Sequence, residues 1–163
     1  MELTFYTCAL VALASALRCV THTNPVHSLL YLVVLLLAVA GIFFAIGAPF
    51  AGALEVIIYA GAIMVLFVFV VMMLNLGAET AEQERAWLKP RTWIGPVILA
   101  TVTLGSLVFG ILRAPGVTGT ATVGAKEVGI SLFGPYLLAV ELASLMLLGA
   151  LVAAYHLGRD ETR

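Results

Sequence analysis

Two side chains that could handle a proton lie in the third of the apolar runs, AGALEVIIYAGAIMVLFVFVVMMLNL (51–76): Glu55 and Tyr59. They are four residues apart, which puts them on one face of an α-helix. A charged side chain at the centre of a bilayer costs about 2.5–3.5 kcal/mol on insertion scales, so acids retained there commonly serve transport. We therefore predict a polar stripe that holds a water molecule or a proton. Because the helix is expected to start near residues 50–53, stabilisation of its dipole by Glu55 is the alternative.

A second acid, Glu141, lies in LLAVELASLML (137–147). It is about eight residues, or about 12 Å, inside a helix predicted to begin at Phe133, and so lies close to the middle of the membrane. A carboxyl at that depth is a candidate site on a proton path. The alternative is a neutral acid that forms a hydrogen bond with Ser144, three residues further on, or with a neighbouring chain.

A glycine between two alanines, Gly61, precedes a run of bulky apolar residues that includes Met64, Val65, Phe67 and Val68. Small residues let another helix approach closely. They also favour a local change of helical winding such as a one-residue π-bulge, which turns the following side chains by about 100°. These five residues are the candidates for a helix switch or gate, and close packing at the glycine remains the alternative.

The composition requires that these residues be positioned by membrane-spanning helices. Of 163 residues, 63% are hydrophobic and 10% charged, with a mean hydropathy of +1.13, whereas globular chains are about 25% charged. All six prolines fall in predicted connections or first helical turns, where the missing N–H does least harm. We predict an all-α integral membrane protein, one membrane domain with five transmembrane helices near 2–20, 26–46, 53–76, 93–112 and 133–157 and a short tail at 158–163.

The distribution of lysine and arginine predicts the orientation. One side of the membrane receives six of them, Arg18, Arg85, Lys89, Arg91, Arg159 and Arg163, and the other receives Arg113 and Lys126. We expect the N-terminus outside, in the periplasm, and the C-terminus in the cytoplasm. Trp87 and Trp93 are expected to anchor the fourth helix at the interface.

Several classes of function are disfavoured. A net charge of −1 and a pI near 6.3 give no basic surface for nucleic acid. Nucleotide-binding glycine loops and the HExxH zinc motif do not occur. The histidines His22, His27 and His156 lie at predicted helix ends, without the spacing that would hold a haem. Cys8 and Cys19, about 16 Å apart along a helix, are expected to be two buried thiols. We expect no cofactor and no metal on this chain.

Four segments together resemble one family, the subunit J of bacterial NADH:quinone oxidoreductase (respiratory complex I) and its mitochondrial counterpart, NADH dehydrogenase subunit 6. These segments are THTNPVHSLLYL (21–32), FAGALEVIIYAGAIMVLFVFVVMMLNL (50–76), WLKPRTWIGP (87–96) and LFGPYLLAVELAS (132–144). The resemblance covers nearly the whole chain, and the third-helix block is its most specific part.

The resemblance implies a core subunit of a proton-pumping enzyme, multi-pass in the inner (plasma) membrane of a bacterium. It implies that this chain carries no redox chemistry itself, and that FMN, the iron–sulfur clusters, NADH and quinone are bound by other subunits. The implied partners are other membrane subunits of complex I, including the quinone-site subunit and antiporter-like subunits, together with lipid.

In this family the third helix can adopt or lose a π-bulge, and its rotation is linked to opening a water path between the quinone site and the antiporter-like subunits. The matching positions run from Tyr59 through Gly61 to Val65 and Phe67. Glu55 matches the acid of the family's third helix, for which proton transfer is implied, and Glu141 matches an acid in its fifth.

Two other functions compete with a coupling switch. The first is a structural scaffold whose polar groups only hold helices together, with no proton path. The second is a small subunit of a multi-chain cation/proton antiporter. The absence of an internal repeat in the sequence argues mildly against an independent transporter.

Overall fold

The computed structural model describes residues 2–22, 25–74, 90–113 and 123–158. They belong to two compact units, 1–122 and 123–163. The first unit contains α1 (Glu2–Thr21), α2 (Pro25–Ala45), α3 (Pro49–Leu54), η1 (Glu55–Ile63), α4 (Met64–Leu74) and α6 (Pro90–Arg113). The second contains α7 (Ala125–Leu132) and α8 (Leu137–Gly158). Every regular element in these ranges is a helix, which confirms the all-α prediction.

Among the described residues, five helical segments are long and apolar enough to cross a membrane. They are Glu2–Thr21, Val26–Ala45, Pro49–Val71, Trp93–Leu112 and Leu137–Gly158. The third consists of α3, η1 and the first part of α4. The prediction of five spanning helices is confirmed, and the orientation of the termini stays a prediction. Trp87 and the basic residues Arg85, Lys89, Arg159 and Arg163 lie outside the described ranges.

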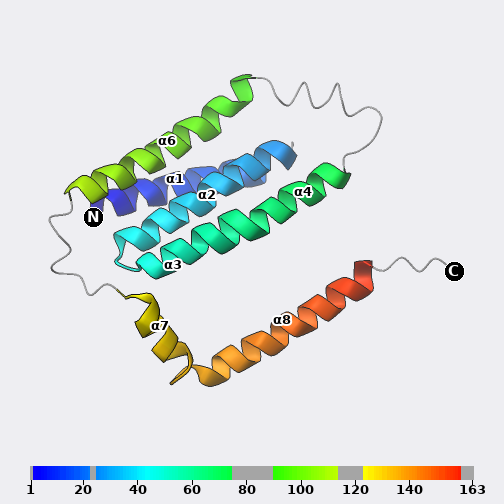
Figure 1. Ribbon diagram of the computed structural model, residues 1–163. Coiled ribbons are helices and arrows are strands. Elements are labelled where there is room, and N and C mark those ends of the chain that lie inside the picture. Colours follow the sequence, from blue (N-terminus) through cyan, green and yellow to red (C-terminus); the bar gives the residue numbers. More distant parts are fainter. Residues whose placement is uncertain (1, 23–24, 75–89, 114–122, 159–163) are drawn as a thin grey trace. The chain divides into compact units, whose positions relative to one another are not determined.

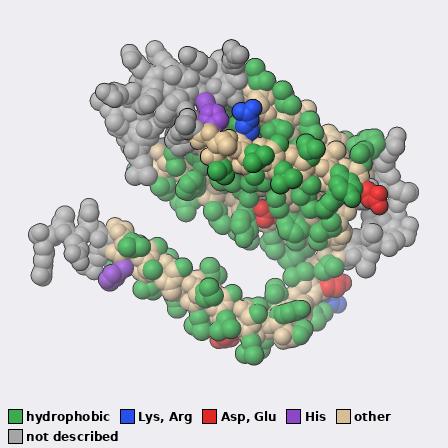
Figure 2. Space-filling model, turned by 180° about the vertical axis from the view of Figure 1, so that it is seen from behind, with side chains coloured by type: hydrophobic (Ala, Val, Ile, Leu, Met, Phe, Trp, Pro, Cys, Tyr) green, Lys and Arg blue, Asp and Glu red, His purple; other side chains and the backbone are tan. Residues whose placement is uncertain are grey.

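Helix α2 is the centre of the first unit. It packs against α1, α6 and all three parts of the third span, so these helices lie side by side (Figure 1). The core consists of Val11 and Ala12 from α1 with Val34 and Ala38 from α2. Most outward side chains are apolar, and Figure 2 shows hydrophobic atoms over most of the visible described surface. Such a surface suits contact with lipid or with other membrane helices.

Small and weakly polar residues join α1 to its two neighbours. The Cys8 side chain is fully buried and faces Gly41 of α2, where an added Cβ would lie 2.8 Å from its Sγ. The Cys8 Sγ is also 3.5 Å from the Ser106 Oγ of α6. The Thr4 hydroxyl donates to the Ser106 carbonyl oxygen at 3.3 Å. The expectation of two buried thiols is therefore met at Cys8, whereas Cys19 is only partly buried.

A tight turn joins α2 to α3 and moves the start of the third span. Gly47 has a positive φ of 85°. The Ala48 N–H donates to the Phe43 carbonyl at 2.9 Å and the Gly47 N–H to the Phe44 carbonyl at 3.3 Å, the two bonds of a Schellman motif. Pro49 then takes the first helical position, for which its fixed φ is suited. The span thus begins at Pro49, four residues before the predicted start at residue 53.

Directly after this turn, the third span lies tightly against α2. Gly52 is buried, and an added Cβ would lie 3.1 Å from both the Ala40 carbonyl oxygen and the Phe44 ring. A glycine at this position lets the two backbones come together, as small residues do between membrane helices.

The other helix boundaries also differ from the sequence prediction. Helix α6 begins at Pro90, where residue 93 was predicted, and Pro96 lies inside it. The prediction that every proline would lie in a connection or a first turn was therefore wrong for Pro96. Pro96 is the seventh residue of α6 and lacks the N–H that would donate to the Thr92 carbonyl oxygen, so one bond of the backbone ladder is missing in the second turn.

The sequence prediction left residues 113–132 as a connection between the fourth and fifth spans, and it missed the helix α7 there. The Gly124 N–H donates to the Glu127 carboxylate at 2.8 Å, an N-terminal capping interaction. After α7 a turn follows, in which the Tyr136 N–H donates to the Ser131 carbonyl at 3.2 Å. Pro135 in this turn lacks an N–H, and α8 starts at Leu137, four residues later than predicted.

The Cys8 and Gly41 contact predicts a coupled effect on stability. Gly41→Ala should lower the free energy of unfolding by about 1–3 kcal/mol, because the added methyl group overpacks against the thiol. Cys8→Ala should restore space, so the double variant should lose less than Gly41→Ala alone. Thermal unfolding of the purified protein measures both. Gly105→Ala is the control, since its Cβ meets nothing within 4 Å; equal losses at both glycines would contradict the prediction.

Candidate functional site

The middle of the third span is π-helical from Glu55 to Ile63. At its end the Met64 N–H donates to the Tyr59 carbonyl, five residues back, and also to the Gly61 carbonyl. At its start the Glu55 N–H donates to the Ala51 and Gly52 carbonyls, four and three residues back. The backbone angles at both ends stay in the α region. The wider winding is therefore inserted into a continuous helix without a break.

Gly61 is placed where this winding leaves little room for a side chain. An added Cβ would lie 3.1 Å from the Val56 carbonyl oxygen, which belongs to the same helix five residues back. No atom of another described helix lies within 4 Å of that position. Close packing of a second helix on Gly61, the alternative to a change of winding, is thus not observed among the described residues of this chain.

The candidate gate residues divide between two faces of the helix. Met64 is 3% exposed, and Val68 lines a pocket with Val26, Leu29, Leu30 and Val33 of α2. Val65 and Phe67 are exposed and lie on the outer surface of this chain. The inner pair holds the span against α2, whereas the outer pair is free to face another subunit or lipid.

Glu55 and Tyr59 are both in the π-helical stretch, with Glu55 partly buried and Tyr59 exposed. Because the span begins at Pro49, Glu55 is its seventh residue and lies beyond the first turn. The helix dipole acts mainly within that first turn, so the dipole alternative for Glu55 loses its basis. No hydrogen bond joins the two side chains within the described part of the chain.

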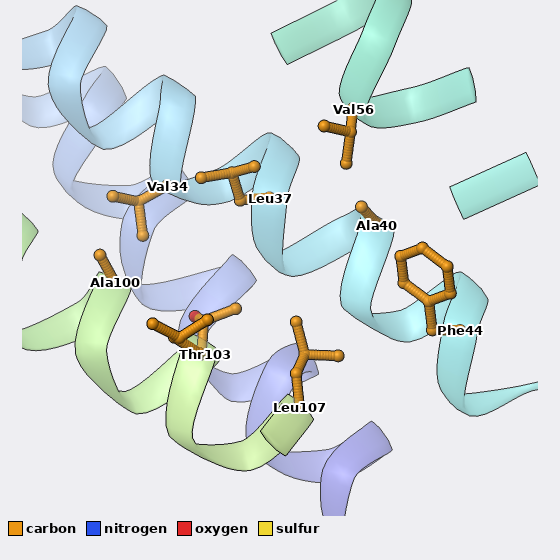
Figure 3. Close-up of a pocket in the computed structure, with 9 residues that line it drawn as sticks. Val34, Leu37, Ala40, Phe44, Val56, Ala100, Thr103 and Leu107 are labelled. Carbon is orange, nitrogen blue, oxygen red and sulfur yellow. The ribbon is translucent and has the colours of Figure 1, made fainter. Parts of the chain in front are cut away.

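An apolar cavity of about 140 Å³ lies beside the π-helical stretch. The side chains that point toward it in Figure 3 come from three helices. They are Val34, Leu37, Ala40 and Phe44 of α2, Ala100, Thr103 and Leu107 of α6, and Val56 of η1. Its one polar lining side chain, Thr103, donates its hydroxyl to the Leu99 carbonyl at 2.9 Å. The space is apolar and partly open to the surface of the chain, so it suits a hydrocarbon side chain better than an ordered water molecule, which needs polar partners.

Glu141 belongs to the second unit and is the fifth residue of α8. It lies about 6 Å from the start of the helix rather than the predicted 12 Å. The Ser144 hydroxyl donates to the backbone carbonyl of Glu141 at 2.7 Å. The hydroxyl proton of Ser144 is thus used on the backbone, and no hydrogen bond between Ser144 and the Glu141 carboxyl group is observed among the described residues. The α8 side chains are almost all exposed, and Glu141 is available to another chain.

The cavity and its lining residues were not identified from the sequence. Val56 looks like any other apolar residue of the run, and only the packing of α2 and α6 creates space beside it. In the described ranges, no group of three or more His, Cys, Asp or Glu side chains could hold a metal ion. The site offers one carboxyl, one phenol and a wide helical turn, which suits proton handling and conformational change.

Comparisons with known proteins place this arrangement in one family. The family model for NADH-ubiquinone/plastoquinone oxidoreductase chain 6 matches residues 15–157. The chain is 62% identical to the NADH-quinone oxidoreductase subunit J of Escherichia coli (strain K12), over 99% of this chain and 88% of that protein. It is 61% identical to the subunit J of Pseudomonas aeruginosa, over 100% and 99%. The subunit J of Buchnera aphidicola subsp. Acyrthosiphon pisum is 50% identical, over 99% and 95%. The chain therefore belongs to the NADH-ubiquinone/plastoquinone oxidoreductase chain 6 family, which includes the subunit J of bacterial NADH-quinone oxidoreductase.

Proposed function

We propose that this chain is a non-catalytic membrane subunit that couples quinone reduction elsewhere in the complex to proton translocation, through a change of winding in its third span. As a member of its family, it is a subunit of an enzyme complex and works with the other subunits of complex I. The observation that supports a switch is the π-helical stretch from Glu55 to Ile63 in the middle of a membrane span.

A π-helical stretch can convert to α-helix by a slip of one residue in the backbone ladder, without breaking the span. Such a slip turns the side chains beyond it by about 100°. Gly61 favours the wide winding, because a side chain there would press on the Val56 carbonyl oxygen. The cavity next to Val56 provides space for the side-chain movement that a slip requires.

The rotation would change what faces the proton path. Val65 and Phe67 lie on the outer side of the helix, and turning them about 100° moves two bulky groups away from one neighbour and toward another. Water is excluded in one state and admitted in the other. Glu55 and Tyr59 on the same span would supply proton sites beside the path, and Glu141 on α8 is a further candidate for proton transfer.

From the coupling role we also propose which subunits and which membrane surround the chain. NADH, FMN, the iron–sulfur clusters and quinone are bound by other subunits of the complex. The outer face of the third span meets the quinone-site subunit or antiporter-like subunits, and lipid covers the remaining apolar surface. The chain lies in the bacterial inner membrane, with its N-terminus in the periplasm and its C-terminus in the cytoplasm.

Gly61→Ala tests the winding directly. In the π-helical form the added methyl group would lie 3.1 Å from the Val56 carbonyl oxygen, a tight contact that disfavours this winding relative to the α-helix. We expect the assembled complex to keep NADH oxidation with a soluble electron acceptor and to lose several-fold in proton pumping. Proton uptake by reconstituted vesicles measures the pumping.

Gly105→Ala is the matched control for that test, because it makes the same substitution inside a spanning helix with open space around it. It should pump like the unmodified complex. Full coupled pumping by an assembled Gly61→Ala complex would contradict the switch.

Glu55→Gln and Glu141→Gln separate the proton-path proposal from the scaffold alternative. Each amide keeps the shape of the acid but carries no titratable proton, so we expect pumping and quinone-coupled turnover to fall while assembly is retained. Glu127→Gln is the control: it lies outside the spans, and an amide oxygen still accepts the Gly124 N–H. If both variants pump normally and only assembly responds to changes at Gly61, the scaffold function is correct.

A further inference from the structure

Helix α1 ends, and α2 and α6 begin, at one end of the first unit (Figure 1). A surface groove of about 540 Å³ is lined by residues near this end. Its lining is partly polar and partly apolar. The polar side chains are Arg18 and Thr21 of α1 and Tyr31 of α2. The apolar walls include Leu17 of α1 and Ile98 of α6. The proposed coupling mechanism uses none of these residues.

The position of the Tyr31 hydroxyl is fixed by its surroundings. Tyr31 is 9% exposed, and its ring stacks on the His22 imidazole with centroids 6.3 Å apart. Its hydroxyl lies directly against Gly95 of α6, where any Cβ would collide with it. The glycine thus allows a phenol O–H to reach the groove between α1 and α6, and this O–H has no hydrogen-bond partner within the described part of the chain.

The hydrogen-bond donors that remain available in the groove are suited to binding an anion. Arg18 is exposed and pairs with no carboxylate among the described residues. The Thr21 hydroxyl already donates to the Leu17 carbonyl at 2.7 Å, so the donors that remain are the guanidinium and the Tyr31 O–H. Arginine is suited to phosphate, because its planar group presents parallel N–H donors to two oxygens.

The apolar part of the groove would not be filled by a free anion, so a fitting ligand also needs a hydrocarbon portion. Leu17 and Ile98 form apolar walls of the groove. Ala14 and Leu99 continue its lining about one turn further into α1 and α6 than Arg18 and Gly95. Because both helices cross the bilayer, this direction leads toward the membrane interior. A ligand that satisfies both ends has an anionic phosphate and a hydrocarbon chain. Basic pockets between membrane helices commonly hold lipid headgroups in this way. The predicted orientation puts this end of the unit on the cytoplasmic side.

We propose that this groove binds an anionic glycerophospholipid, with its phosphate on Arg18 and Tyr31 and one acyl chain along Leu17 and Ile98. The site lies apart from the π-helical stretch and does not depend on the proposed coupling function. A bound lipid there would fill the space between α1 and α6 at the membrane surface and so fix the relative position of the two helices.

The test uses the assembled complex in phosphatidylcholine nanodiscs that contain a phosphatidylglycerol with a diazirine on its acyl chain next to the glycerol. After photolysis, mass spectrometry should locate adducts on the peptides that carry residues 14–21 and 95–99. Arg18→Gln should lower this labelling about tenfold, the loss expected for a charge-assisted hydrogen bond, and Tyr31→Phe should lower it less. Arg18→Lys should lower the labelling less than Arg18→Gln, because it keeps the charge but loses the parallel N–H donors. Lys126→Gln, a cation outside the groove, should leave the labelling unchanged.

Assembly of each variant is checked by gel filtration and by NADH oxidation with a soluble acceptor, so a misfolded variant is recognised. Unlabelled phosphatidylglycerol should compete for the site and inorganic phosphate should not. Three results would each overturn the proposal: equal labelling of the unmodified and Arg18→Gln complexes, displacement by inorganic phosphate alone, or no labelling of these peptides because a partner subunit covers the groove.

Discussion

Backbone hydrogen bonding inside the membrane is the constraint on which the whole structure depends. In lipid, each N–H and C=O must find its partner within its own helix, because no water is available to replace it. The third span changes its winding from α to π and back, yet keeps its ladder continuous from Pro49 to Leu74. A broken helix would leave several groups unpaired. A wide turn is therefore a form of irregularity that a lipid-facing span can tolerate, and it occurs here beside an acid and a tyrosine.

The sequence was sufficient for the number and approximate position of the spans, because each needs about twenty apolar residues and the chain contains five such runs. Boundaries were less accurate where a single residue decides them. Gly47 and Pro49 start the third span early through a turn that is invisible to hydropathy. Glu127 caps a short helix in a stretch that otherwise resembles a loop. At Phe133 the apolar character continues into a turn, so the start of α8 was predicted too early.

For the candidate site, the sequence identified the residue types but not their arrangement. Gly61 was a candidate for altered winding, and it lies in the π-helical stretch. The start of that stretch at Glu55 could not be predicted, since α and π windings accept the same apolar residues and leave no distinct hydropathy pattern. The cavity beside Val56 and the groove beside Arg18 depend on how three helices pack together. Both spaces are formed by residues that are distant in sequence, so no local sequence pattern could have predicted either space.

The close approach at Gly52 decides which part of the third span can move. This end is anchored by the hydrogen-bonded turn at Gly47 and by the close approach at Gly52, where even an added Cβ would lie 3.1 Å from the Ala40 carbonyl oxygen and the Phe44 ring. Beyond η1, α4 contacts α2 less extensively, and most of its described side chains point outward. If the winding of η1 changes as proposed, the rotation is expected on the α4 side, where it would have to release Met64 and Val68 from their contacts with α2. Subunits that contact α4 would then be displaced, whereas those near α3 would stay in place.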